Sequence, residues 1–116
     1  MSLQTLQKPW QFRHVYRNGE KIDCKYAVVF YYRTGDSTDG PQFGFVASKR
    51  VGGAVKRNRA KRLLREVAND TVKRLRHRDV WIVLVARAVI KNTKRQELLV
   101  DIGGRLEDGG LIERSS

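Results

Sequence analysis

Two segments of this sequence carry apolar side chains on both faces of an expected β-strand. In Lys25–Arg33, Tyr26, Val28, Phe30 and Tyr32 alternate with Ala27, Val29 and Tyr31, and Asp79–Arg87 (DVWIVLVAR) is apolar almost throughout. A strand with one face in water would alternate apolar and polar residues. In a sheet built on these strands, both faces must therefore pack against other elements of the protein or bind a ligand.

Helices are expected to pack on these two faces of the sheet. Pro9 suits the opening turn of a short first helix, and Gly19 lies just past its end. Apolar residues recur at three- and four-residue steps over residues 54–76, which indicates a long amphipathic helix. Asn92 or Thr93 is expected to cap a last helix.

The remaining elements complete one expected domain over residues 1–116. A short strand is expected at residues 21–23 and another at 43–49, which gives the order αβββαβα. The predicted fold class is α+β: a single-domain α/β sandwich with a mixed sheet of about four strands and helices packed on it. Residues 1–8 and 108–116 are expected to be flexible.

Charge is the next constraint on the chain. Its 116 residues include 24 Lys and Arg against 12 Asp and Glu, a formal net charge of +12. Residues 49–78 hold 12 of the basic and 2 of the acidic groups, so they alone carry a net +10. A concentrated basic patch in a chain with an ordinary apolar content predicts a folded domain that binds a polyanion.

The sequence argues against several other protein classes. The longest apolar run, Val80–Ala86, has seven residues, and a membrane-spanning helix needs about 20. The N-terminal segment has polar residues and Pro9 where a signal peptide would have an apolar core. Cys24 is the only cysteine, which leaves no internal disulfide and no cysteine-based zinc site. A cytoplasmic protein without membrane contact is expected.

The strongest functional pattern is the segment from Lys49 to Glu66, KRVGGAVKRNRAKRLLRE. Arg57, Lys61 and Arg65 lie four residues apart and form one row of like charge along the expected helix. Cations near a helix N-terminus oppose the helix dipole, so folding alone does not favour them. A bound phosphate group would make these cations favourable at the helix N-terminus, because N-terminal amides and guanidinium groups both donate hydrogen bonds to phosphate oxygens. An ordinary solvated face would mix the two signs of charge.

Aromatic residues form a second pattern. Phe12 and Tyr16 lie one turn apart on the first expected helix, and Phe30 lies on the aromatic face of the following strand. Such residues belong more often to a core than to a ligand platform. Aromatic surfaces beside a basic patch also hold single-stranded nucleic acid by stacking, so both interpretations are open.

No residues indicate a catalytic site on the protein. His14 and His77 are far apart in the sequence, and the Asp residues of the expected turns do not pair as a metal or acid–base site. The sequence therefore predicts neither catalytic residues nor a protein metal site.

The basic segment resembles the signature of the bacterial ribonuclease P protein component. The family pattern is a strand-terminal Lys, then Gly-x-Ala-Val-x-Arg-Asn-Arg-x-Lys-Arg-x-x-Arg-Glu, matched here by Gly52, Ala54, Val55, Arg57, Asn58, Arg59, Lys61, Arg62, Arg65 and Glu66. The resemblance extends over residues 6–100. It implies a ribosomal protein S5 domain 2-like fold with a left-handed βαβ crossover, although about 98% of such connections are right-handed.

The resemblance also implies a function. The chain would be the protein subunit of ribonuclease P, in which a catalytic RNA uses Mg²⁺ to remove the 5′ leader of precursor tRNA. One monomeric protein would accompany each RNA, and the RNA would bind most of the Mg²⁺. The implied contacts with the catalytic RNA are Lys49, Arg50, Lys56, Arg57, Asn58, Arg59, Lys61, Arg62 and Arg65. The leader would cross a cleft lined by Phe12, Tyr16 and Phe30.

The residues alone also allow two other functions, neither of which includes a role in a nuclease. Phe43, Gly44, Phe45 and Val46 partly match the aromatic strand motif of RNA-recognition modules. A small basic ribosomal protein would share the charge and would need no leader cleft.

Overall fold

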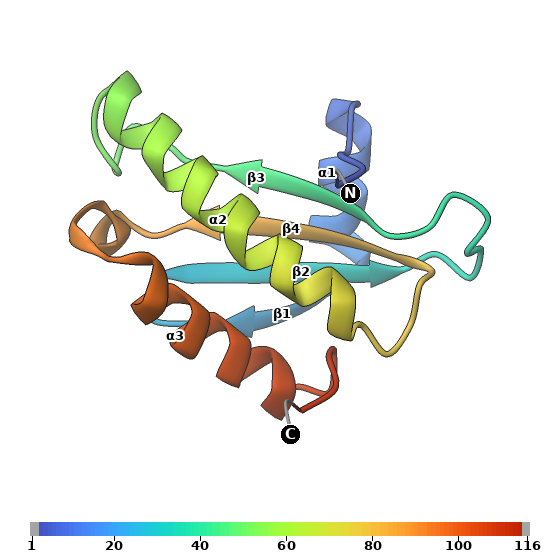
Figure 1. The fold of residues 1–116 in the computed structure, drawn as a ribbon. Coiled ribbons are helices and arrows are strands. Elements are labelled where there is room, and N and C mark those ends of the chain that lie inside the picture. The colour runs from blue at the N-terminus through green and yellow to red at the C-terminus, as the bar shows by residue number, and fades with distance from the viewer. Residues whose placement is uncertain (1–2, 115–116) are drawn as a thin grey trace.

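The structure, a computed structural model, describes residues 3–114. Figure 1 shows its elements in chain order: α1 (Pro9–Asn18), β1 (Glu20–Asp23), β2 (Ala27–Arg33), β3 (Gln42–Val46), α2 (Ala54–Arg74), β4 (Val80–Ala86), the 3₁₀ helix η1 (Ala88–Asn92) and α3 (Arg95–Asp108). The order αβββαβα is confirmed, with η1 as an added turn before the last helix.

The four strands form one mixed sheet in the order β1-β2-β4-β3. Strand β2 is antiparallel to both β1 and β4, whereas β3 is parallel to β4. The two strands with apolar side chains on both faces, β2 and β4, are the central pair of this sheet. The α+β class and the two-sided burial that the sequence predicts are therefore confirmed.

The connection from β3 through α2 to β4 has the less common hand. In Figure 1, α2 crosses the face of the sheet nearest the viewer, and β3 and β4 run in the same direction with β4 on the β2 side. Seen from α2 with β3 pointing up, β4 lies to the left, so the crossover is left-handed. This is the hand that the family resemblance implies and the general rule disfavours.

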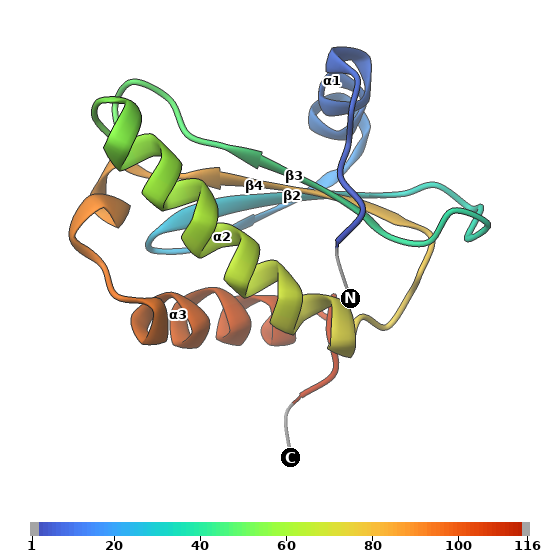
Figure 2. The ribbon, with the colours of Figure 1, turned by 45° about the horizontal axis from the view of Figure 1, so that its top comes forward.

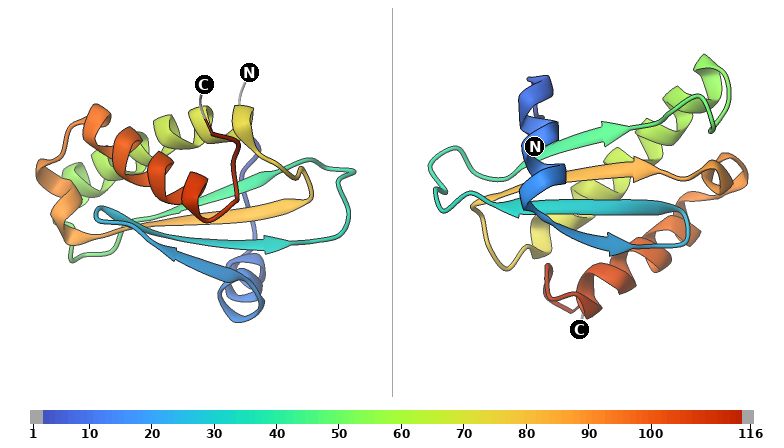
Figure 3. Two further views of the ribbon diagram at one scale, coloured as in Figure 1. Left: turned by 90° about the horizontal axis from the view of Figure 1, so that it is seen from below. Right: turned by 180° about the vertical axis from the view of Figure 1, so that it is seen from behind.

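Helices cover the two faces of the sheet unequally. Helices α2 and α3 lie on one face and α1 lies on the other (Figures 2 and 3). The core under α2 and α3 is large and includes Phe43, Leu64, Ile82, Leu84, Leu98 and Ile102, all at most 1% exposed. Under α1, Leu6, Val15 and Val83 are buried, and the aromatic residues around them are only partly covered. The α1 face therefore keeps an open aromatic surface.

The last helix begins later than the sequence predicts. Residues Asn92 and Thr93 close η1, where the Thr93 hydroxyl donates to the Val89 carbonyl at 3.2 Å. The N-cap of α3 is Lys94, and its N–H donates to a Glu97 carboxylate oxygen at 3.3 Å. The expected cap at Asn92 or Thr93 is wrong because the hydroxyl of Thr93 is already used within η1.

Two strands are shorter than expected. Strand β3 ends at Val46, and β2 begins at Ala27, which leaves Tyr26 in the preceding turn. The Tyr26 side chain packs on the α2 and α3 side, and its hydroxyl donates to Glu97 at 3.2 Å. Tyr26 therefore does not share the face of Phe30, contrary to simple alternation.

The described parts of both end segments pack on the domain. The N–H of Leu6 donates to the Phe43 carbonyl at 2.9 Å, and the N–H of Glu113 donates to the Arg74 carbonyl at 2.7 Å. Residues 1–2 and 115–116 lie outside the described residues. Flexibility of residues 1–8 and 108–116 stays a prediction.

Candidate nucleic-acid interface

An exposed turn with one buried residue connects β3 to α2 and carries two cations. Val51 is fully buried and anchors this turn to the core. Gly52 has φ of 140°, and a Cβ there would lie 2.7 Å from the Lys56 side chain. Glycine is therefore favoured here by the backbone conformation, while the nearby Lys56 side chain is exposed and can move. The exposed side chains of Lys49 and Arg50 lie in this turn, just before α2.

Arg57, Lys61 and Arg65, hereafter the basic row, follow one another at four-residue steps on α2. Arg57 and Lys61 are half-buried and Arg65 is exposed, with its guanidinium 5.4 Å from the ring centroid of Phe45. That distance allows a cation–π contact that holds the Arg65 side chain over the β3 edge. Among residues 3–114, no carboxylate forms an ion pair with any cation of residues 49–65.

Arg59 differs from its neighbours because it bonds within the protein. Its guanidinium donates to the carbonyls of Thr93, at 2.5 Å, and Lys91, at 3.4 Å. These bonds connect α2 to η1, so Arg59 has a structural role that its place in the basic segment does not reveal. Asn58 and Arg62 are exposed on the same helix. RNA contacts by Arg59, Asn58 and Arg62 stay predictions.

Phe12, Tyr16 and Phe30, hereafter the aromatic surface, lie on the α1 face. The rings of Tyr16 and Phe30 meet edge to face with centroids 4.9 Å apart. Burial raises the pKa of Tyr16 above its ordinary value of 10.0, so its hydroxyl keeps its proton at neutral pH. Phe12 lies over Gly44, where a Cβ would come within 2.4 Å of the Phe12 ring. The structure thus brings the α1 residues and the β2 residue onto one surface.

A second aromatic cluster lies on the same face and was not predicted. Trp10 and Trp81 are 5.8 Å apart between ring centroids, and His14 meets Tyr32 edge to face at 4.6 Å. A hollow of about 260 Å³ beside this cluster is lined by Trp10, Arg13, His14, Arg17 and Asn18. The i, i+4 spacing of Trp10 and His14 was a usable signal, but the Trp81 contact depends on the sheet register, which pairs Tyr32 with Trp81.

The basic row and the aromatic surface lie on opposite sides of the sheet. Figure 2 shows α2 and α1 on opposite faces of the sheet. The row belongs to α2, and the aromatic surface belongs to α1 and to the face of β2 that packs under α1. They are two separate surfaces rather than one basic patch with adjoining aromatic rings. Arg13 and Arg17 of α1 are the exposed cations next to the aromatic residues.

Metal-ligating and thiol side chains are a further feature of the described residues. Within residues 3–114, no three His, Cys, Asp or Glu side chains are grouped so that they could hold a metal ion. Cys24 is buried, and burial, with a further contribution from Asp101, raises the pKa of its thiol to about 12. In the same range, none of the helices has both the length and the apolar composition needed to cross a bilayer.

Comparison with known proteins identifies the family. The family model for ribonuclease P matches residues 2–108 of this chain. The chain belongs to the ribonuclease P protein family. The match covers the turn after β3, the basic row and the aromatic surface, so both candidate surfaces lie inside the family region.

Two curated relatives and one solved structure agree with that membership. The ribonuclease P protein component of Symbiobacterium thermophilum is 34% identical over 103 residues, which cover 89% of this chain and 88% of the relative. That of Syntrophomonas wolfei is 29% identical over 106 residues, 91% of this chain and 87% of the relative. The RNase P protein structure of Staphylococcus aureus matches the fold with a TM-score of 0.82 at 21% identity, over 97% of this chain and all of that one.

Family membership and burial decide between the sequence-based alternatives. Phe43, which would supply an aromatic ring in an RNA-recognition module, is fully buried beneath α2. A ring in that position cannot stack on a nucleotide base. The RNA-recognition alternative is therefore wrong, and membership in the ribonuclease P family also replaces the ribosomal one.

Proposed function

We propose that the chain is the protein subunit of a ribonuclease P ribonucleoprotein and that the basic row binds phosphates of its catalytic RNA. One observation carries this proposal: the cations of residues 49–65 form no ion pair with any carboxylate of the described chain. Like charges at four-residue spacing repel each other. RNA phosphates would remove that repulsion and accept hydrogen bonds from the guanidinium groups.

The aromatic surface is proposed to bind the single-stranded 5′ leader of precursor tRNA. Tyr16 is 41% exposed, and Phe30 is half-buried, so part of each ring is open to solvent. Bases of any sequence stack on such rings, and nearby cations hold the backbone phosphates. Arg13 and Arg17 lie on the same helix as Tyr16 and are exposed.

Hydrolysis of precursor tRNA is assigned to the RNA rather than to the protein. Magnesium prefers oxygen ligands, above all carboxylates and phosphates. The two candidate surfaces offer cations and aromatic rings instead, so these residues do not fit a Mg²⁺ site. In this proposal the RNA holds the metal, and one cytoplasmic protein accompanies each RNA and positions the substrate.

The proposal is tested by cleavage of a precursor tRNA with ribonuclease P RNA at low Mg²⁺ concentration. Adding this protein should raise the cleavage rate, because its cations reduce phosphate repulsion between the two RNAs. A variant with Arg57→Ala, Lys61→Ala and Arg65→Ala should stimulate much less. No stimulation by protein shown to be folded would overturn the proposal.

The leader surface has its own test. Phe30→Ala should weaken binding of precursor tRNA by about 1 to 3 kcal/mol and leave binding of mature tRNA nearly unchanged, because a stacked base contributes that much. Tyr31→Ala is the matched control, because Tyr31 is also half-buried on β2 but packs on the α2 and α3 side. Equal losses for both tRNAs in Phe30→Ala would place Phe30 in the core only.

A further inference from the structure

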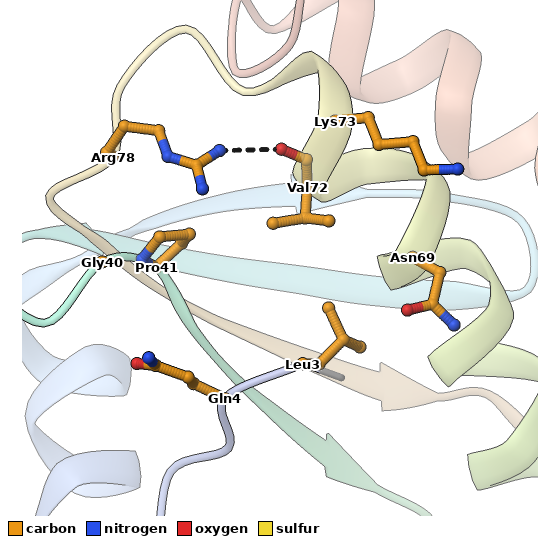
Figure 4. A pocket seen from close by; sticks show the side chains of 8 residues that line it. All are labelled: Leu3, Gln4, Gly40, Pro41, Asn69, Val72, Lys73 and Arg78. Carbon is orange, nitrogen blue, oxygen red and sulfur yellow. Dashed lines mark hydrogen bonds between the residues drawn. The ribbon is translucent and has the colours of Figure 1, made fainter. Parts of the chain in front are cut away.

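A pocket of about 390 Å³ lies beyond the end of the basic row, on the α2 side of the sheet. Figure 4 shows it between the N-terminal segment, the loop before β3 and the C-terminal half of α2. Its volume falls within the range of about 300 to 1,000 Å³ that is usual for ligand sites. Neither the basic row nor the aromatic surface contributes to its lining.

The pocket combines an apolar interior with a cationic rim. The side chains of Leu3, Pro41 and Val72 face one another across its interior (Figure 4). Lys73 and Arg78 supply two exposed cations, and one Arg78 nitrogen donates to the Val72 carbonyl at 2.9 Å, which holds the guanidinium at the rim. No carboxylate is among the described residues that line it. Such a site favours a ligand with an apolar part and a negative charge.

Two side-chain amides add polar specificity to this lining. Gln4 and Asn69 line the pocket, and each carries both a donor and an acceptor. Base edges display the same mixture of donors and acceptors. Among common anionic ligands, a nucleotide therefore matches the apolar, amide and cationic parts of the lining together.

Backbone contacts fix the walls before any ligand arrives. The N–H of Phe43 donates to the Gln4 carbonyl, and the N–H of Leu6 donates to the Phe43 carbonyl, both at 2.9 Å. The N-terminal segment is therefore paired with β3. On the other side, Pro41 is buried and the preceding Gly40 has φ of 70°, so that part of the loop is held as well.

The pocket continues the basic row. Asn69 and Lys73 extend the four-residue spacing of Arg57, Lys61 and Arg65 by two further steps. Lys73 lies eight residues beyond Arg65, or about 12 Å along the helix axis. An RNA strand that contacts the basic row would therefore reach the rim of the pocket within a short distance.

We propose that this pocket takes one unpaired nucleotide of the RNA that docks on the basic row. The base lies against Leu3, Pro41 and Val72, and the two phosphates that flank it contact Lys73 on one side of the pocket and Arg78 on the other. The inference rests on the proposed function for its RNA. It adds a site at which the protein selects an unpaired position in that RNA instead of contacting phosphates alone.

Photocrosslinking in the assembled complex with ribonuclease P RNA tests the occupant. Cys24 is 5% exposed, so a Gln4→Cys variant can be labelled at its new thiol with a photoreactive group. Gln96→Cys is the matched control, because Gln96 is exposed on α3 away from this pocket. The label at position 4, and not at 96, should crosslink to one or a few neighbouring unpaired nucleotides. Crosslinks only to paired nucleotides, only to a second copy of the protein, or to nothing would overturn the proposal.

The rim is tested separately by salt dependence. Lys73→Ala with Arg78→Ala should weaken binding of the same RNA about tenfold or more and reduce the slope of log K against log salt by about 1.5 to 2. Arg76→Ala is the control, because Arg76 lies 3.7 Å from Glu113 and is paired. If the basic-row variant weakens binding but the rim variant does not, the pocket proposal fails and the docking proposal stands. If neither variant has an effect, both fail.

Discussion

The two halves of α2 differ in whether their charged residues form ion pairs. Residues 54–65 hold six cations and no acid, and no ion pair involves those cations within the described chain. In residues 66–74, Glu66 lies 3.4 Å from Arg95, and Arg74 lies 3.1 Å from Asp70 and 2.6 Å from Glu107. Glu66 and Arg74 of the C-terminal half therefore attach α2 to α3. In the N-terminal half only Arg59 bonds within the protein, to the carbonyls of Lys91 and Thr93, and the other cations have no carboxylate partner among the described residues.

This difference separates residues that stabilise the fold from residues that we propose bind RNA. A paired, partly buried arginine contributes to folding through hydrogen bonds to charged groups. An unpaired cation near a helix N-terminus opposes folding slightly through the dipole and through its neighbours. Substitutions of paired and of unpaired cations on α2 should therefore change different properties: stability for the paired ones and RNA affinity for the unpaired ones.

The largest expected effect is on RNA affinity. Arg57→Ala with Lys61→Ala and Arg65→Ala should weaken binding to ribonuclease P RNA by about 3 to 4 kcal/mol, or a hundredfold to a thousandfold. The free energy of unfolding should stay the same or rise, because like-charge repulsion is relieved. Filter binding and urea unfolding measure the two quantities. A stability loss that accounts for the weaker binding would contradict the separation.

Arg74→Ala should show the reverse behaviour. The Arg74 side chain is 20% exposed and donates to Asp70, Glu107 and the Glu113 carbonyl. Its loss should lower the free energy of unfolding by about 2 to 3 kcal/mol. RNA affinity, measured where the variant is fully folded, should stay within twofold of wild type. A large affinity loss would mean that the C-terminal half of α2 also docks RNA through this residue.

Arg59 should contribute to stability, like Arg74, although its substitution should have a smaller effect on the free energy of unfolding. Removing its bonds to the carbonyls of Lys91 and Thr93 by Arg59→Ala should cost about 1 to 2 kcal/mol in urea unfolding. Asn58→Ala, the neighbouring control, should change stability by less than about 0.5 kcal/mol. Unchanged stability in Arg59→Ala would mean that Arg59 has no structural role and belongs with the cations that are proposed only to bind RNA.

The smallest expected effect is a pH dependence at a structural pair. Arg33 Nε donates to Asp79 at 3.0 Å, which holds the pKa of Asp79 below its ordinary 3.8. A folded pKa below the unfolded one stabilises the protein above about pH 4, and this stabilisation is lost as pH falls through the folded value. Asp79→Asn should therefore lose less stability than wild type between pH 5 and pH 3 in urea titrations. Identical acid sensitivity would remove Asp79 as a contributor.

The sequence predicts those parts of the fold that depend on local pattern. Strands β2 and β4 could be predicted because a central strand that is buried on both faces has apolar residues at consecutive positions, without polar residues at every second position. The cap of α3 was misplaced because the Thr93 hydroxyl bonds within η1, which no local spacing reveals. The left-handed crossover followed from the family resemblance, since strand and helix patterns contain no information on hand.

In the candidate site, too, the features that depend on local sequence could be predicted and those that depend on distant contacts could not. The basic row was readable because four-residue spacing and an absence of acids are properties of one helix. The partners of Arg59 are 32 and 34 residues away in the sequence, and the contact between Trp10 and Trp81 depends on sheet register. The pocket beside Lys73 joins three separate segments, so only the folded chain brings its lining together.

The most direct measurement of whether the N-terminal half of α2 neutralises RNA phosphates is the salt dependence of binding. Wild-type protein and the variant with Arg57→Ala, Lys61→Ala and Arg65→Ala are titrated with ribonuclease P RNA between 50 and 200 mM salt. Counterion release predicts that the slope of log K against log salt falls in magnitude by about 2 to 3 in the variant. Equal slopes for the two proteins would contradict a phosphate contact at the basic row.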